Sequence, residues 1–142
     1  MYRDQAAAQN LIEILLAVTQ ICRGEIKHLR GELKVSFTQF KILSAIRRDI
    51  DQVSLLCEEL NTCQPAMSKT IDGLVKSGFL MRKSSTSDGR KIRIHLTGKG
   101  EAAYNAVRKR ICATVTKRLS LLHKSEQRKA DETISRLLAV LK

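Results

Sequence analysis

The sequence predicts a mainly α-helical protein that carries one short antiparallel β-hairpin. Apolar residues recur at helical spacing along most of the 142 residues, and a period of two appears only in the segment KIRIHL, residues 91–96. The only proline, Pro65, stands where a helix is expected to begin, so it breaks none of the predicted helices. A chain of this length forms one domain, or one core with an oligomerisation arm.

A long first helix is expected over residues 4–31. Its apolar residues follow the spacing of one helical face, which predicts a mostly buried amphipathic helix. These residues are Leu11, Ile14, Leu15, Val18, Ile21, Cys22 and Leu29. Gly31 is the expected end, because glycine commonly follows the last helical residue.

A capping box predicts the start of a second helix near Phe37. The Ser36 side chain can accept a hydrogen bond from the backbone amide of Gln39, whose own side chain can reach back to Ser36. The residues that this helix is expected to bury are Phe40, Leu43 and Ile46. The polar segment 49–52 ends it.

A tight turn between two short helices follows. The first of them is expected over residues 55–60 with Ser54 as its cap, and Asn61 tolerates the left-handed conformation that ends a helix. The second is expected over residues 65–77, with Gly78 closing it. Short helix, tight turn and short helix form the helix-turn-helix arrangement.

The second of these short helices would present two different faces. Its apolar face consists of Met67, Ile71, Leu74 and Val75. The residues left pointing outward are Gln64, Ala66, Ser68, Lys69 and Asp72. Short, polar and basic side chains near the N-terminus are what a helix needs to approach base edges in a DNA major groove.

A hairpin with a cationic tip is expected next. Its strands lie in FLMRKSS and KIRIHL, and the second strand alternates between apolar and polar residues. The apolar ones are Ile92, Ile94 and Leu96, and the others are Arg93 and His95. The intervening segment 86–90 is rich in turn formers and ends in an arginine.

Two further helices are expected after the hairpin. Thr97 is the expected cap of a helix that extends to about Leu122, and Ser125 is the expected cap of the last helix. The last helix has an apolar face that consists of Ile134, Leu137, Leu138 and Leu141. Such a face indicates a partner surface.

The positive charge of the chain is concentrated beyond residue 63. The formal net charge is +12, yet residues 1–63 hold eight basic and eight acidic side chains. Residues 64–100 hold eight basic and two acidic ones, and residues 101–142 hold ten and four. This asymmetry suits a polyanionic partner, because each phosphate neutralised by Lys or Arg releases a counterion and adds affinity. A solvated basic surface is the alternative reading.

Several classes of protein are not expected. Apolar runs are only a handful of residues long, as in residues 14–18, and the N-terminus lacks a basic segment followed by an apolar one, so a cytoplasmic protein is expected. The sequence contains no serine nucleophile motif, glycine-rich phosphate loop or paired acidic site, so neither an enzyme nor a cofactor is expected.

The cysteines and histidines do not predict a metal site. The cysteines lack C-x-x-C pairs and each lies in or beside a helical pattern, so reduced thiols are the simpler interpretation. They are Cys22, Cys57, Cys63 and Cys112, and the scattered histidines are His28, His95 and His123. One thiol differs from the others: Cys63 would stand at a helix N-terminus near Lys69, a setting that favours the thiolate. Cys63 is therefore a candidate redox sensor, with an inert thiol as the alternative.

Over nearly its whole length the chain resembles the MarR-type winged helix-turn-helix transcriptional regulators, and three segments carry the resemblance. The second-helix pattern of that family resembles VSFTQFKIL, and its recognition helix is similar to MSKTIDGLVKSGFLMR. Its wing signature, Asp, any residue, Arg, then Leu-Thr-x-x-Gly, resembles SDGRKIRIHLTGKG. The matching residues are Asp88, Arg90, Leu96, Thr97 and Gly100.

The resemblance implies a homodimer with two kinds of region. Residues 1–34 and 101–142 would form a helical dimerisation region, and residues 35–100 a winged helix-turn-helix lobe that binds DNA. By the same resemblance, the recognition positions are Gln64, Ala66, Ser68 and Lys69. Arg90 would enter a minor groove, with Asp88 holding it in place. Cys63 and Pro65 depart from the commonest family pattern.

The basic strands suggest contacts to the DNA backbone rather than to bases. The residues expected to make them are Arg82, Lys83, Lys91 and Arg93. Taken together, these features predict a dimeric, sequence-specific transcriptional regulator that binds an imperfect palindrome of double-stranded DNA. A repressor released by a small-molecule effector or by a redox signal is expected. A non-sequence-specific architectural DNA-binding protein and a protein-interaction domain that has lost DNA binding are the alternatives.

Overall fold

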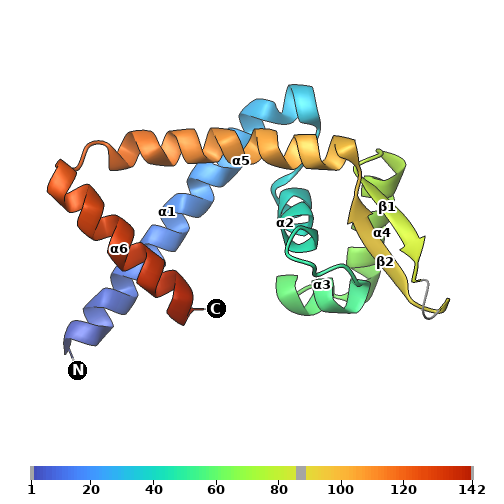
Figure 1. Ribbon diagram of the computed structural model, residues 1–142, viewed down its shortest axis with the longest axis horizontal. Coiled ribbons are helices and arrows are strands. Elements are labelled where there is room, and N and C mark those ends of the chain that lie inside the picture. Colours follow the sequence, from blue (N-terminus) through green and yellow to red (C-terminus); the bar gives the residue numbers. More distant parts are fainter. Residues whose placement is uncertain (1, 86–88, 142) are drawn as a thin grey trace. The chain divides into compact units, whose positions relative to one another are not determined.

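The structure is a computed structural model that describes residues 2–85 and 89–141. Within these residues it contains six helices and one two-stranded antiparallel sheet, so the predicted fold class is confirmed (Figure 1). The elements are α1 (Tyr2–Leu33), α2 (Phe37–Ile46), α3 (Val53–Leu60), α4 (Gln64–Lys76), β1 (Leu80–Ser84), β2 (Ile92–Leu96), α5 (Gly98–Leu119) and α6 (Lys124–Val140).

The chain divides into two compact units. The larger unit comprises Cys22–Lys109, and the smaller unit comprises the residues up to Ile21 together with those from Arg110 onward. Helices α1 and α5 each contribute residues to both units. The helix-turn-helix formed by α3 and α4, and the hairpin of β1 and β2, lie wholly within the larger unit.

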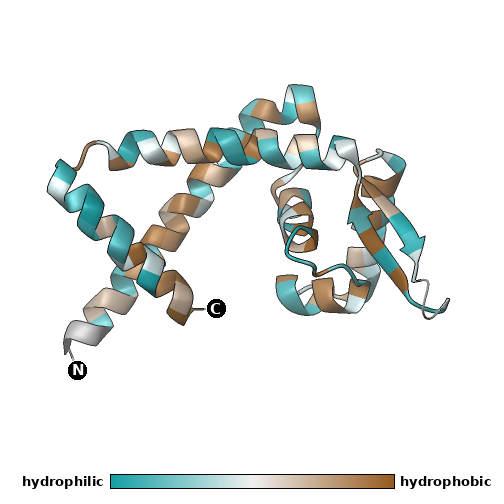
Figure 2. Ribbon diagram, in the orientation of Figure 1, coloured by the Kyte–Doolittle hydropathy of each residue, from teal (hydrophilic) through white to brown (hydrophobic). Residues whose placement is uncertain are grey.

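The hydrophobic core belongs to the larger unit. Each of its elements contributes side chains with almost no exposure, among them Ile42, Leu43, Leu56, Met67, Ile71, Leu74, Leu80 and Ile94. Figure 2 shows apolar residues of this set on α2 and on β2. The predicted inward face of α4 is confirmed, because Met67, Ile71 and Leu74 are buried and Val75 packs against the core.

Local signals for helix ends are confirmed at several places. The Ser36 side chain accepts a hydrogen bond from the Gln39 amide at 3.1 Å, and the Gln39 side chain accepts one from the Ser36 amide at 2.8 Å. Asn61 ends α3 with φ 48° and Gly78 follows α4 with φ 79°. Thr97 Oγ1 accepts from the amide of Gly100 at 3.0 Å, as expected of a cap.

Other helix ends differ from the prediction. Helix α3 begins at Val53 after an extended Gln52, so the predicted cap at Ser54 is wrong. The carbonyl of the preceding residue, Asp51, accepts a hydrogen bond from the Ile94 amide at 2.8 Å. This pairing with β2 keeps the chain extended up to Gln52, and the helix starts directly after it.

Helix α6 begins at Lys124, so the predicted cap at Ser125 is also wrong. His123 has the extended backbone of a cap residue, and its Nδ1 accepts from the Ser125 amide at 3.4 Å. The Glu126 side chain accepts in return from the His123 amide at 2.9 Å. Helix α1 in turn continues past Gly31 to Leu33, because the left-handed conformation that follows it is adopted by Lys34 with φ 50°.

The prediction of a mostly buried first helix holds only for the C-terminal part of α1. Ile26 and Leu29 are buried, whereas Ile14 and Leu15 are 58% and 63% exposed. The apolar residues in the N-terminal half of α1 are visible in Figure 2. No described side chain of the smaller unit is buried. A single chain therefore leaves this apolar surface uncovered, although none of the described helices combines the length and hydrophobicity needed to cross a bilayer.

The hairpin has a regular register. Leu80 lies opposite Leu96, and Ser84 lies opposite Ile92. The predicted apolar face of β2 is buried only in part, because Ile94 has no exposure while Ile92 is 56% exposed. Ile94 lies in the middle of β2, whereas Ile92 lies at the end nearest the hairpin loop.

Candidate nucleic-acid interface

The N-terminal part of α4 presents a polar face to solvent. Because Met67 and Ile71 are anchored in the core, the residues between them turn outward. The residues that the sequence places on this face are Gln64, Ala66, Ser68, Lys69 and Asp72; Ser68 is half-buried and the others are exposed. A face of small and polar side chains can approach base edges closely.

The start of α4 is electrostatically suited to an anion. Its first turn contains no acidic residue, and its N-cap residue, Cys63, makes no side-chain capping hydrogen bond. The partial positive charge of the helix N-terminus is therefore not neutralised locally. Phosphate groups are favoured at such an end.

The wing, defined as residues 80–96, carries a dense set of cations. Its basic residues are all exposed, and they are Arg82, Lys83, Arg90, Lys91 and Arg93. Two of them, Lys83 and Arg93, lie directly opposite each other across the strands. Like charges in this position destabilise a hairpin unless an acidic group or a bound anion offsets them.

Two arginines of the wing are paired with aspartates of the helix-turn-helix region. Arg82 Nη2 donates to Asp72 Oδ1 at 2.5 Å, which joins β1 to α4. Arg93 Nη1 donates to both carboxylate oxygens of Asp51, at 2.8 and 3.0 Å. The side chain of Asp51 is only 10% exposed and that of Asp72 is 62% exposed, so the second pair is the more sheltered.

Sequence reasoning missed both pairs, and it missed the role of Asp51 altogether. Asp51 and Arg93 are 42 residues apart, and Asp51 stands in a polar segment that predicts only a helix break. No local pattern marks it as a buried acid. The pairing arises because the segment before α3 lies against β2, where the Ile94 amide also reaches Asp51.

Arg90 is exposed beside the start of β2. The neighbouring Ser85 amide donates to the Lys91 carbonyl at 2.8 Å, so the hairpin pairing continues past the ends of the two strands. Asp88, the predicted partner of Arg90, lies outside the described residues, as do Thr86 and Ser87.

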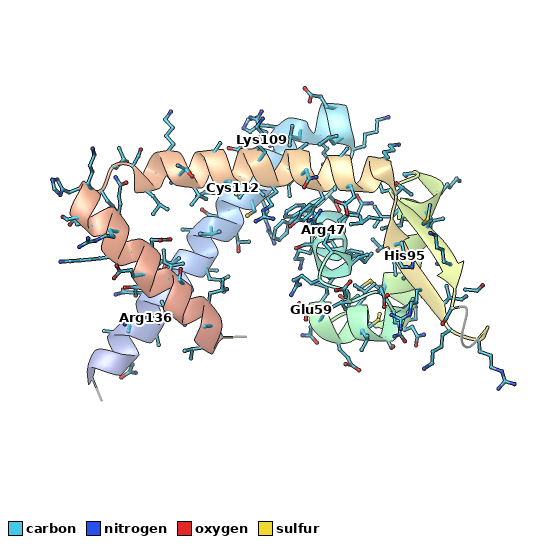
Figure 3. All side chains as sticks on the ribbon, viewed as in Figure 1. Arg47, Glu59, His95, Lys109, Cys112 and Arg136 are labelled. Carbon is cyan, nitrogen blue, oxygen red and sulfur yellow. The ribbon has the colours of Figure 1, made fainter. Side chains whose placement is uncertain are left out.

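A second set of contacts fixes the start of α5 against α2. Arg47 forms an ion pair with Glu101, and its guanidinium lies 5.0 Å from the centre of the Tyr104 ring. Tyr104 in turn stacks on Phe40, with ring centres 5.4 Å apart. Figure 3 labels Arg47, the C-cap residue of α2, and His95 of β2, which line the same hollow together with Glu101.

A hollow of about 220 Å³ lies between α1 and the start of α2. Three of its lining residues, Arg23, Lys27 and Arg30, are exposed cations from one stripe of α1. The guanidinium of Arg23 lies 5.4 Å from the centre of the Phe37 ring, which also lines the hollow. No acidic residue is among the lining residues, so the site favours an anion.

The described cysteines and histidines do not assemble into a metal site. No three Cys, His, Asp or Glu side chains come together in the described part of the chain as a metal ion would require. Cys63 is exposed at the start of α4, Cys57 is half-buried, and Cys112 is exposed on α5. Cys63 is therefore accessible to solvent, directly before Gln64, the first of the predicted recognition positions.

This chain is similar to known proteins in both sequence and fold. A sequence model of the MarR family matches residues 35–92, which include α2, α3, α4 and β1. The solved structure of the transcriptional regulator Tm0710 from Thermotoga maritima has a TM-score of 0.71 to this chain at 22% identity, over 94% of each chain.

Two further solved structures share the fold. MarR from E. coli in its apo form has a TM-score of 0.70 at 21% identity, covering 90% of this chain and 96% of that chain. A MepR mutant from S. aureus, bound to an oligodeoxyribonucleotide, has a TM-score of 0.63 at 17% identity, covering 96% of this chain and 98% of that chain. The resemblance to MarR-type winged-helix regulators is thus confirmed by the family match and by the fold.

Proposed function

We propose that this chain, whose residues 35–92 match the sequence model of the MarR family, is a homodimeric, sequence-specific DNA-binding regulator of transcription that acts as a repressor. The observation that supports this most directly is the juxtaposition, within one unit, of an uncapped α4 N-terminus and a wing with five exposed cations. A helix end that attracts phosphate, next to a basic hairpin, suits two adjacent grooves of one duplex.

Each part of this surface has its own role in the proposal. The first turns of α4 enter a major groove, where the residues that approach bases are Gln64, Ala66, Ser68 and Lys69. The wing follows the sugar-phosphate backbone toward the adjacent minor groove. Its members are Arg82, Lys83, Asp88, Arg90, Lys91 and Arg93, with Arg90 entering the groove and Asp88 orienting it.

The proposal includes a homodimer because one chain offers one reading helix. The exposed apolar side chains of the smaller unit would be covered by a second copy, and they include Ile14, Leu15, Leu121, Leu137, Leu138 and Leu141. Residues 1–34 and 101–142 would then form the dimerisation region, with residues 35–100 as the DNA-binding lobe. Two α4 helices about 34 Å apart would match the spacing between the two half-sites of an imperfect palindrome.

Release of the DNA is proposed to follow an effector. The hollow between α1 and α2 suits a small anionic molecule, since three cations and an aromatic ring line it. A ligand that binds one arrangement of the dimer better than the other shifts the population toward it. Weaker binding of a candidate anion to an Arg30→Gln variant than to the wild type, by calorimetry, would support this site; equal binding would contradict it.

A redox signal at Cys63 is the second release mechanism that we propose. The thiol is exposed at the N-cap of α4, so oxidation would add bulk and polarity where the helix approaches DNA. The accessibility of the thiol and its place on the recognition face are the observations that favour it.

The experiment that tests the proposed function compares two DNA duplexes. Binding of the full chain to its own promoter region is measured against a random duplex of equal length over a range of salt concentrations. A regulator favours its operator by about a thousandfold or more, whereas an architectural protein binds both with the same steep salt dependence. The lack of any binding at moderate salt would leave only a protein-interaction domain.

A further inference from the structure

Arg93, one of the cations of the wing, is already engaged inside the larger unit. Its Nη1 contacts both oxygens of the Asp51 carboxylate, and Asp51 as a residue is only 7% exposed. A phosphate contact that drew Arg93 away from this carboxylate would break the pair. The acid would then be left nearly buried with its charge uncompensated, which is strongly unfavourable.

Asp51 holds the wing by its main chain as well as by its side chain. Its carbonyl oxygen accepts a hydrogen bond from the Ile94 amide at 2.8 Å. One residue thus contacts two successive residues of β2, and the next residue, Gln52, is the N-cap of α3. Asp51 therefore joins β2 of the wing to the start of the helix-turn-helix.

The charge pattern of the hairpin gives this junction a second purpose. Lys83 lies directly opposite Arg93, so the two strands bring like charges together. The Asp51 carboxylate offsets one of them from outside the hairpin. The matching pair on the other strand, Arg82 with Asp72, is more exposed and contributes less.

We infer that Asp51 and Arg93 are a positioning pair for DNA recognition. The pair positions β2, the strand that follows Arg90 and Lys91. Arg93 therefore contributes to DNA affinity by positioning this strand and not by contacting a phosphate. The inference rests on the proposed function, since the position of the wing matters only if the wing meets DNA. It adds Asp51, an acidic residue, to the residues on which affinity depends.

The inference makes Asp51→Asn the decisive substitution. Removing a negative charge raises the net positive charge of the protein, so a surface that bound DNA by charge alone would bind more tightly. A positioning pair predicts the opposite sign: Asp51→Asn weakens binding to the protein's own promoter by roughly five- to hundredfold, the range for losing one or more wing contacts.

The binding experiment uses full-length wild type, Asp51→Asn, Arg93→Gln and the double variant. We expect the three variants to be weakened to the same extent and to share one salt slope, because residues that act as a unit are non-additive. Hydroxyl-radical protection of the flanking minor groove should fade in all three. If Asp51→Asn binds as well as the wild type or better, or if Arg93→Gln alone lowers the salt slope by about 0.9, the inference is wrong.

Asp49→Asn is the matched control. It makes the same chemical change two residues earlier, at an exposed position with φ 64°, a conformation that Asn tolerates. We expect it to bind DNA like the wild type. Equal weakening by Asp49→Asn and Asp51→Asn would show that the loss of affinity does not depend on the contact with Arg93, and the inferred pair would be wrong.

A measurement without DNA separates this inference from the proposed function. Hydrogen exchange of the free protein should be faster across 92–96 in Asp51→Asn and unchanged in α2. Unchanged exchange of β2 would show that Asp51 does not hold this strand, even if the wild type binds its promoter. Should Asp51→Asn fail to fold, the exchanged pair Asp51→Arg with Arg93→Asp replaces it: recovery of β2 protection supports the pair, and failure to recover it counts against it. Wild-type protein that does not prefer its promoter would contradict the proposed function alone.

Discussion

A Cβ atom placed on Gly100 would lie 2.1 Å from the carbonyl oxygen of Phe79. The first turn of α5 thus passes directly over the backbone that leads into β1, at a distance that only glycine permits. Thr97 Oγ1 strengthens the same junction by donating to the Gly78 carbonyl at 2.5 Å. The Leu-Thr-x-x-Gly part of the wing signature therefore describes a close crossing of two backbone segments.

Gly100→Ala is expected to lower the free energy of unfolding by about 1–3 kcal/mol, because the carbonyl of Phe79 must move to make room. Chemical denaturation of the two proteins measures the difference. Gly73→Ala is the control, since no atom lies within 4 Å of its added Cβ and the site is inside α4. That variant should be more stable than wild type by about 0.5–1 kcal/mol. Equal stability of the two variants would contradict the close approach of Gly100 to the backbone of Phe79.

Arg90→Ala is expected to weaken binding to the protein's own promoter by about 1–3 kcal/mol without lowering the unfolding temperature. The side chain is exposed and lies outside the hydrophobic core, so its loss is not expected to destabilise the fold. Fluorescence anisotropy at moderate salt gives the affinity. Lys76→Ala removes a charge from the opposite end of α4 and should bind like the wild type. Unchanged affinity of Arg90→Ala would remove Arg90 from the interface.

Lys83→Ala and Lys91→Ala test the backbone contacts of the wing. If each lysine neutralises one phosphate, the log–log salt slope of binding becomes shallower by about 0.9 in each variant. Discrimination between promoter and random duplex should hardly change, because phosphates carry no sequence. Slopes equal to that of the wild type would mean that these side chains stay in solvent.

Leu138→Asp is expected to shift the protein from dimer to monomer. Leu138 is 55% exposed in the single chain, and a charge there could not be covered by an apolar partner surface. Sedimentation over a range of concentrations measures the change. Ser135→Asp places the same charge on an exposed polar position of α6 and should leave the dimer intact. A wild-type protein that is monomeric at high concentration would refute the proposed assembly.

Cys63→Ser separates a redox sensor from an inert thiol. The serine variant keeps a polar residue at the N-cap of α4 and should bind DNA at least as well as the wild type. Peroxide is expected to release DNA from the wild type and not from the variant. Release that is equal in both proteins would exclude Cys63 as the sensor, and Cys112→Ser then tests the other exposed thiol.

The sequence predicted those parts of the fold that are decided within a few residues of chain. The Ser36 capping box, the left-handed Asn61 and the glycine that follows α4 all depend on local hydrogen bonds and on local steric freedom. The outward residues of α4 followed from the spacing of its apolar face, which is again a local property. The basic surface of the wing could be predicted for the same reason.

The tertiary structure decided what depends on distant segments coming together. Asp51 became the partner of Arg93 only because the segment before α3 lies against β2, and that contact also moved the start of α3 away from Ser54. Ile92 is exposed although it belongs to the same apolar face of β2 as the buried Ile94. Sequence periodicity states that a face is apolar, but burial requires another surface opposite that face, and only the packed chain or its assembly supplies it.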